Sequence, residues 1–136
     1  MFLQIPTISI YEQVYPGNKS KDSLKRGLWK LPYSVIPNIV GQGSNLVIVG
    51  HRISFGHVSP PPFFYLNLLE QGDLITVYYK NRRFKYEIKK VFDTEYTNVK
   101  IEEVVEGEDK LTLYTCTPIL NPSKRLVVKA YLVSIE

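Results

Sequence analysis

Short stretches rich in β-branched and aromatic residues recur along the whole chain, and turn residues separate them. The clearest pair, Leu74–Lys80 and Arg83–Lys90, flanks Asn81, and its second arm alternates apolar with charged residues from Phe84 to Lys89. A period of two is what a strand with one buried face requires, and a short turn between two such runs predicts a β-hairpin. Repetition of this pattern restricts the chain to folds built mainly from strands.

The composition points the same way. The chain has 14 valines, 12 isoleucines, 7 threonines and 17 aromatic residues, but a single alanine, Ala130. Alanine is the best helix former, whereas β-branched and aromatic side chains favour a pleated surface. With 136 residues, of which 44% are hydrophobic and 22% charged, the chain can bury enough surface to fold as one domain over residues 1–136. We therefore expect a single all-β domain and exclude a disordered chain.

Charge and cysteine content exclude several functional classes. The net charge of +4 favours solubility but does not demand a nucleic-acid partner. One cysteine, Cys116, excludes an internal disulfide and a cysteine-based zinc site. No apolar stretch approaches the about 18–20 residues of a membrane span, and Phe2–Pro6 is too short and too polar for a signal peptide. The chain as given is therefore expected to be soluble.

The remaining patterns predict further strands and two short helices. Leucines at helical spacing predict a helix over Ser20–Leu31, and a second short helix is expected over Phe63–Glu70. Prolines and glycines between residues 32 and 43 predict a long loop. Strands are expected at two places in Leu3–Tyr15 and over Asn45–Gly50, Asn98–Val104, Leu111–Cys116 and Arg125–Ile135. Roughly seven or eight strands at this spacing predict a closed barrel or a sandwich.

Cys116 and Arg125 lie where two predicted strands follow one another. Alternation in Leu111–Cys116 places the two leucines on one face and Thr112, Tyr114 and Cys116 on the other. In the next strand, Arg125 lies opposite the apolar face. If the two strands pair as an antiparallel hairpin, Cys116 and Arg125 come together at one end, both off the core. A thiol and a guanidinium then share a surface groove, which is not where a cysteine that merely fills space would lie.

Each of these residues also has an ordinary interpretation. A lone cysteine is usually a small buried hydrophobe, and most arginines are simply surface residues. His51, which follows the apolar run Asn45–Gly50, competes with His57 for any role that needs a histidine. Tyr114 can equally be an aromatic cross-strand partner. The residues by themselves leave these alternatives open.

Several segments in a fixed order resemble the sortases, the cysteine transpeptidases of bacterial surfaces. Thr112–Pro118 (TLYTCTP), followed by Arg125–Val128 (RLVV), resembles the cysteine and arginine signature of that family, and Gly41–Arg52 resembles its histidine segment. Leu3–Pro6 resembles the opening strand, and Leu69–Asp73 stands where the family has a Leu-x-x-Gly-Asp element. The resemblance covers nearly the whole chain. It implies a closed or nearly closed sortase-type eight-stranded β-barrel with one or two short helices.

The resemblance also implies a role for each of the three residues. Cys116 would be the nucleophile, because a thiolate attacks a carbonyl readily. His51, which directly follows the strand and its glycine, would be the general acid and base in preference to His57. Arg125 would stabilise the oxyanion or the substrate backbone as a fixed donor. Together they support acyl transfer through a thioester. The expected substrate-binding residues are Thr112, Tyr114 and Thr115.

The family's chemistry implies a substrate, an acceptor and a location. The substrate would be a surface protein with an LPXTG-like C-terminal sorting signal, cut between Thr and Gly. The acceptor would be an amine of a peptidoglycan precursor or of a pilin. The enzyme would act at the extracellular face of the cytoplasmic membrane, held by an N-terminal helix that is absent from this sequence. The three-residue mechanism needs no metal or organic cofactor. Gly50–Arg52 and the short loop between Cys116 and Arg125 look most like class E or class D enzymes.

Two charged stretches suggest other partners but favour simpler interpretations. The basic run Lys80–Lys85 is more typical of a solvated hairpin face that protects a sheet edge than of a nucleic-acid site. The acidic residues between 102 and 109 lie where some sortases bind calcium, yet they show no recognisable ligand spacing, and a solvated loop is expected. Two alternatives from other functional classes remain: a non-catalytic β-barrel module that binds peptides, and a cysteine hydrolase that uses water as acceptor.

Overall fold

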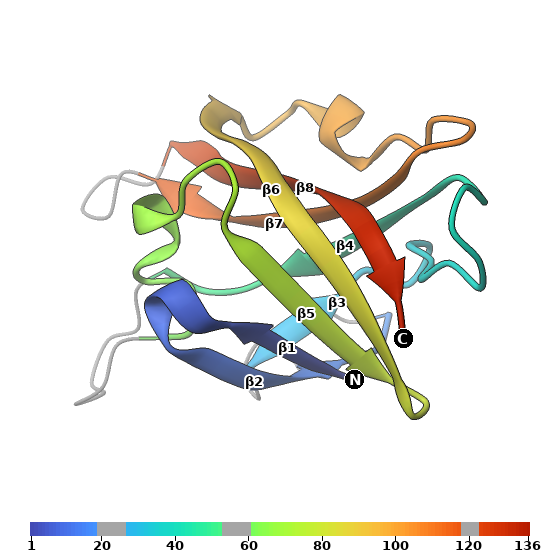
Figure 1. Ribbon diagram of the computed structural model, residues 1–136. Coiled ribbons are helices and arrows are strands. Elements are labelled where there is room, and N and C mark those ends of the chain that lie inside the picture. Colours follow the sequence, from blue (N-terminus) through green and yellow to red (C-terminus); the bar gives the residue numbers. More distant parts are fainter. Residues whose placement is uncertain (19–26, 53–60, 118–122) are drawn as a thin grey trace.

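Eight strands form one closed barrel in the computed structural model, which describes residues 1–18, 27–52, 61–117 and 123–136 (Figure 1). Three short 3-10 helices, η1 to η3, connect some of them. The strands are β1 (Phe2–Ile5), β2 (Ile10–Tyr15), β3 (Leu28–Lys30), β4 (Ser44–Val49), β5 (Leu74–Tyr79), β6 (Arg82–Glu95), β7 (Asp109–Thr117) and β8 (Lys124–Ile135), and the helices are η1 (Pro6–Ile8), η2 (Leu66–Leu68) and η3 (Val99–Glu102). The expected all-β class and eight-stranded barrel are confirmed.

The order of strands around the barrel is β1-β2-β3-β4-β7-β8-β6-β5. Most neighbours are antiparallel, but β2 pairs with β3 and β4 pairs with β7 in parallel. The parallel pair β4–β7 joins segments that are far apart in the chain, with Ser44 opposite Asp109. This pairing places the residues after β4 beside the residues at the end of β7. It therefore sets the geometry of the site described below.

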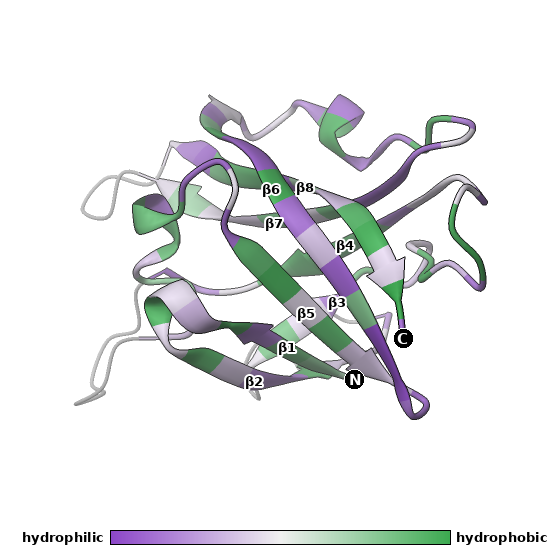
Figure 2. Ribbon diagram, in the orientation of Figure 1, coloured by the Kyte–Doolittle hydropathy of each residue, from purple (hydrophilic) through white to green (hydrophobic). Residues whose placement is uncertain are grey.

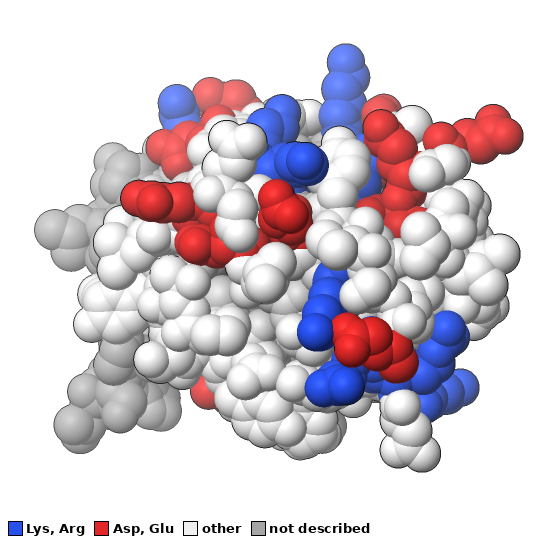
Figure 3. Space-filling view, in the orientation of Figure 1, with Lys and Arg blue, Asp and Glu red and all other residues white. Residues whose placement is uncertain are grey.

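The predicted hairpin is present as β5 and β6, and its turn explains its register. Lys80 and Asn81 both have positive φ, at 49° and 62°, which is the backbone of a two-residue type I′ turn. Figure 2 shows hydrophilic and hydrophobic residues alternating along β6. This strand pairs with β8 along most of its length and with β5 over Arg82–Glu87, so the hairpin half of β6 has a partner on both sides. The basic run around Asn81 therefore lies at a hairpin tip, where positive residues gather at the lower right of Figure 3.

Two apolar clusters lie on opposite faces of the barrel wall. The larger one fills the interior and includes Leu46 and Ile48 of β4. The smaller one lies on the outer face, where Val47 and Val49 of the same strand pack with Ile101 of η3. All six residues of β4 are buried, as expected for a continuous apolar run with no solvent-facing side. The connection between β6 and β7 thus forms a second layer over this part of the barrel.

The helix expected over Ser20–Leu31 is wrong where the structure describes it, because Leu28–Lys30 forms strand β3. Leu28 belongs to the interior cluster, whereas Leu31 belongs to the outer one, so the leucines do not share a face. Pairing with β2 and β4 decides the conformation of this segment. Residues 19–26 of the expected helix lie outside the described residues.

Two other segments differ from expectation. The strand expected over Asn98–Val104 is wrong, because η3 forms there and the Asn98 side chain accepts a hydrogen bond from the backbone N–H of Lys100 at 3.1 Å. The helix expected over Phe63–Glu70 is reduced to the single turn η2. Among the described residues, no helix has the length and apolar character needed to cross a membrane.

Candidate functional site

Three neighbouring strands bring together the three residues that the sequence singles out. β4, β7 and β8 are consecutive in the barrel, and Cys116 of β7 is paired directly with Arg125 of β8. Val49 of β4 stands opposite Tyr114 of β7, and the same register continued by two residues brings His51 level with Cys116. The backbone supports this continuation, since the N–H of Gly50 donates to the Tyr114 carbonyl at 3.3 Å. The three residues therefore form a row across the end of the barrel wall.

Cys116 has the exposure that a nucleophile needs. It is exposed, and it lies on the outer face of β7 together with Tyr114. Leu111 and Leu113 of the same strand point into the barrel interior. The expected division of this strand into a core face and an opposite face is thus confirmed. A cysteine buried as a space-filling residue does not fit this position.

The guanidinium of Arg125 is held by two contacts on its own side of the barrel. Its Cζ atom lies 4.5 Å from the centre of the Tyr114 ring, and its Nη1 atom lies 4.0 Å from Oε2 of Glu102. Burial raises the pKa of the Tyr114 phenol, with Arg125 opposing this effect. Burial also raises the pKa of the Glu102 carboxyl, and the nearby Arg125 and Lys129 oppose it. A cation over an aromatic face and beside a carboxylate is attracted to both, which restricts where the guanidinium lies.

His51 is exposed at the point where the chain leaves β4. Its carbonyl accepts a hydrogen bond from the N–H of Phe63 at 3.2 Å, so a segment that returns to the barrel holds its backbone. The preceding residue, Gly50, packs so closely that a Cβ atom there would lie 2.6 Å from Leu28 and 2.8 Å from Phe63. Only glycine fits this space without a shift, which explains its place before the histidine. The competing histidine, His57, lies outside the described residues, as do residues 118–122 of the loop between Cys116 and Arg125.

Arg52 is a residue of the site that our sequence analysis did not assign a role. Its side chain is buried, and its Nη1 donates to Oγ1 of Thr117 at 2.7 Å. Its Nε also donates to the Phe64 carbonyl at 3.5 Å. Arg52 follows His51 in sequence, and Thr117 follows Cys116, so this hydrogen bond ties together the two segments that carry the histidine and the cysteine. The feature that marks Arg52 is its burial beside the candidate site, and burial cannot be read from the sequence.

The expected substrate-binding residues occupy three different environments. Thr112 is fully buried, and its hydroxyl lies 2.7 Å from Oδ1 of Asn45, so it faces a polar cluster rather than a groove. Tyr114 lies beneath the Arg125 guanidinium and is largely buried. Thr115 points to the interior side of β7, and its buried hydroxyl has no hydrogen-bond partner among the described residues. Of the three, Tyr114 and Thr115 adjoin Cys116, whereas Thr112 supports the layer behind the site.

A buried lysine anchors this layer. The Nζ of Lys129 in β8 donates to the carbonyl of Ile101 in η3 and to Oγ1 of Thr112, the latter at 2.6 Å. Nδ2 of Asn45 donates to the same Ile101 carbonyl at 3.0 Å and to the Glu103 carbonyl at 2.9 Å. Burial lowers the pKa of Lys129 to about 8. These bonds fasten η3, and with it Glu102, to the outer face of the barrel.

The acidic stretch between residues 102 and 109 is only partly the solvated loop that we expected. Glu103 and Glu106 are exposed. Asp109, however, is buried and accepts hydrogen bonds from the N–H groups of Gly41 and Gly43 at 2.6 and 3.0 Å, which closes the turn before β4. No group of three or more histidine, cysteine, aspartate or glutamate side chains is arranged to hold a metal ion within the described part of the chain.

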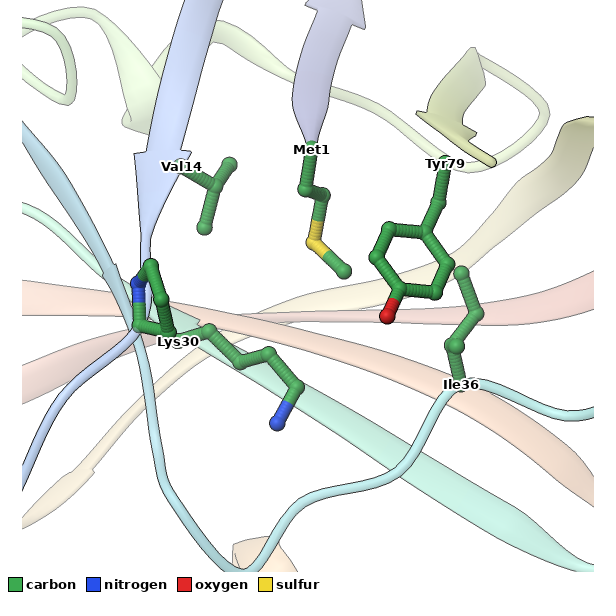
Figure 4. A pocket seen from close by; sticks show the side chains of 6 residues that line it. Met1, Val14, Lys30, Ile36 and Tyr79 are labelled. Atoms are coloured by element: carbon green, nitrogen blue, oxygen red, sulfur yellow. The ribbon is translucent and has the colours of Figure 1, made fainter. Parts of the chain in front are cut away.

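A pocket elsewhere on the molecule does not include the row of three residues. It has a volume of about 220 Å³, and Figure 4 shows Met1, Val14, Lys30, Ile36 and Tyr79 around it. Its walls come from the region around the N-terminus, whereas β7 ends at the opposite side of the barrel (Figure 1). The candidate site is therefore the surface around Cys116 and not this pocket.

Comparisons with known proteins identify the family and agree with the fold. A model of the sortase domain matches residues 3–133. The chain is 30% identical to sortase A of Staphylococcus aureus over 85% of this chain and 53% of that protein, and 29% identical to sortase SrtE1 of Streptomyces coelicolor over 93% and 38%. The chain therefore belongs to the sortase family.

Solved structures show the same fold. The sortase C structure of Streptococcus pneumoniae has a TM-score of 0.86 at 27% identity, with 98% of this chain and 67% of that chain covered. Sortase A of Corynebacterium diphtheriae has a TM-score of 0.86 at 30% identity, covering 99% and 60%. The chain spans about half or less of the length of the two curated relatives above. Their names cover several sortase classes, so the assignment to class E or class D stays a prediction.

Proposed function

We propose that this chain is a cysteine transpeptidase in which Cys116 is the nucleophile, His51 the general acid and base, and Arg125 the donor to the oxyanion. The observation that supports this most is the row of three residues across β4, β7 and β8, with an exposed thiol opposite a fixed guanidinium. Membership of the sortase family, whose model matches residues 3–133, supports the same assignment.

The reaction proceeds in two acyl transfers. The Cys116 thiolate attacks the scissile carbonyl carbon, and the carbonyl oxygen takes the negative charge while Arg125 donates to it. When the C–N bond breaks, His51 gives its proton to the departing amine and a thioester remains on the sulfur. An incoming amine then attacks the thioester carbonyl and loses a proton to His51. The new amide leaves, and the thiolate and the protonated imidazole are restored.

The substrate in this proposal is a protein with an LPXTG-like C-terminal sorting signal, cleaved between Thr and Gly. The acceptor is an amine of a peptidoglycan precursor or of a pilin, and the place of action is the extracellular face of the cytoplasmic membrane. Support comes from the relatives, one of which, the Streptococcus pneumoniae sortase C, was described for its pilin substrate specificity. The proposal involves no cofactor and no nucleic acid, and calcium is not needed for any step.

The proposal is tested by mixing the protein with a panel of LPXTG-like peptides and measuring its intact mass. A mass increase equal to the acyl fragment, absent in Cys116→Ala and discharged by an added amine, is the expected result. Discharge by water alone, with no amide product, would instead identify a hydrolase. Binding of peptide without any thioester would identify a non-catalytic binding module, and our proposal would be wrong.

Variants of the two partner residues test their separate roles. His51→Ala should abolish turnover, whereas His57→Ala should retain a substantial fraction. Arg125→Lys should fold normally and yet lose about 10²–10³ in turnover, because lysine keeps the charge but lacks the planar fork of donors. Near-normal turnover by Arg125→Ala would remove that residue from the site.

A further inference from the structure

We propose that Glu102 is a positioning residue that fixes the Arg125 guanidinium in the orientation needed for acyl transfer at Cys116. This inference rests on the proposed function. Glu102 does not reach the reacting atoms, and it acts through Arg125. It belongs to η3, a turn in the connection between β6 and β7, where the sequence predicted a strand followed by a solvated acidic loop.

The guanidinium of Arg125 is constrained on one face and along one edge. The Tyr114 ring lies under the plane, at 4.5 Å from Cζ, and Oε2 of Glu102 lies at 4.0 Å from Nη1. A guanidinium has five N–H donors in a rigid fork, so a partner at one nitrogen leaves the others for a substrate carbonyl. The ring restrains the guanidinium on one side only. The Glu102 carboxylate attracts Nη1 from the edge, at ion-pair rather than hydrogen-bond distance, and so favours one orientation.

Glu102 is itself held more firmly than a surface glutamate. Its side chain is only 13% exposed, against 26% for that of Arg125. Its second oxygen, Oε1, accepts a hydrogen bond from the hydroxyl of Tyr33, which leaves Oε2 facing the arginine. The backbone on either side is fastened too, because the carbonyls of Ile101 and Glu103 accept hydrogen bonds from the Asn45 side chain. The carboxylate therefore presents one oxygen to Arg125 from a fixed base.

This arrangement should reduce the reorganisation that the site needs when an oxyanion forms. A donor stabilises a developing oxyanion best when it already points at the place where the charge will appear. A free arginine side chain samples many rotamers, and a misplacement of about 1 Å can cost about 10²-fold in rate. The structure offers a chain of contacts from Tyr33 through Glu102 to Arg125 that restricts this freedom before a substrate arrives. Loss of the carboxylate should therefore lower kcat more than it changes KM.

Side-chain NMR tests the positioning directly and needs no substrate. The signal of the Arg125 guanidinium is assigned by its loss in Arg125→Lys. We expect restricted rotation of this group in the wild type, fast rotation in Glu102→Gln, and no change in Glu103→Gln. Glu103→Gln is the matched control, because it removes the same charge from the next residue, which is exposed. Equal rotation in the wild type and in Glu102→Gln would overturn the inference.

Turnover of the sorting-signal peptide provides the second test. Glu102→Gln should lose about 10- to 100-fold in kcat with KM near the wild-type value. In the Arg125→Lys background, the same substitution should cost less than about twofold, because residues that act through one another are not additive. Losses that multiply would mean that Glu102 acts independently of Arg125, and the inference would fail. Tyr33→Phe, at an exposed residue, should give a smaller loss that disappears in the same background.

The two tests separate failure of the inference from failure of the proposed function. If the wild type forms no thioester with any peptide, the proposed function is wrong, and the NMR comparison still decides whether Glu102 orients Arg125. If the wild type turns over and Glu102→Gln matches it in rate and in guanidinium rotation, only the positioning role is lost. Thermal unfolding of each variant shows whether a loss of rate follows from a loss of folded protein.

Discussion

Substitution of Gly50 by alanine should destabilise the protein and damage the site together. The added Cβ atom would lie 2.6 Å from Cδ2 of Leu28 and 2.8 Å from Cδ2 of Phe63. Non-bonded carbon atoms are most stable at about 3.5–4.0 Å, so each neighbour has to move by about 1 Å. Both neighbours are fully buried in the interior cluster and have no free space to move into. The strain must therefore spread into the barrel or into the backbone around His51.

The size of the effect follows from two opposing contributions. Overpacking of a filled core costs about 1–3 kcal/mol. Replacing glycine with alanine also restricts the unfolded chain, which returns about 0.4–1 kcal/mol. The net expectation is a loss of about 1–2 kcal/mol in the free energy of unfolding, which corresponds to a Tm lower by about 3–8 °C for a domain of this size.

The assay combines urea unfolding with turnover of the sorting-signal peptide. Gly50→Ala should lower the urea midpoint, and it should lower kcat even when the protein is fully folded, because the N–H of Phe63 binds the His51 carbonyl at 3.2 Å. Leu28→Val removes one of the two clashing groups, so the double variant should be more stable than the sum of the single changes predicts. A Gly50→Ala protein as stable and as active as the wild type would refute the reasoning.

Four further predictions concern the site and the layer around it. Arg52→Met should lower both the urea midpoint and kcat, because it removes the 2.7 Å hydrogen bond to Thr117 that joins the histidine and cysteine segments, and unchanged kcat would contradict this role. A neutral alkylating agent should label Cys116 stoichiometrically in the folded protein, and labelling only after denaturation would contradict its exposure. The pKa of Lys129, lowered to about 8 by burial, means that the unfolded chain binds more protons between about pH 8 and pH 10.5, so stability should rise with pH across this window. Lys129→Met should remove that rise, measured as urea midpoints against pH. Asp109→Asn should cost about 1–3 kcal/mol of stability through weaker bonds to the turn before β4, measured in the same way.

The central pair of the site could be predicted from the sequence because it depends only on strand periodicity. Alternation in β7 and β8 placed Cys116 and Arg125 off the core face, and the hairpin connection between the strands set them opposite each other. Strand periodicity alone could not place His51, because the parallel pairing of β4 with β7 joins segments that are distant in the sequence and leaves no local pattern. Its assignment came from the resemblance of the surrounding segment to the sortases.

The wrong predictions have physical causes that lie outside the segments themselves. Leu28 and Leu31 have helical spacing, yet one faces the interior and the other the outer cluster, since β2 and β4 pair with the segment on both sides. Thr112 looked like a groove residue because it shares a strand face with Cys116, but η3 covers the part of that face around Thr112. Glu102 looked like part of a solvated acidic run because its burial depends on the packing of η3 against the barrel wall. A period of two shows which residues share a face of a strand, but it does not show whether a second layer covers that face.

Both ends of the described chain lie near the tip of the β5–β6 hairpin, away from the end of β7, the strand that carries Cys116 (Figure 1). Glu136 is held against the barrel, because it exchanges backbone hydrogen bonds with Arg83 at 2.8 and 2.9 Å. A linker attached there would begin from a rigid point and lead away from the thiol. A tether at Glu136 would therefore leave the surface around Cys116 free for large molecules to approach.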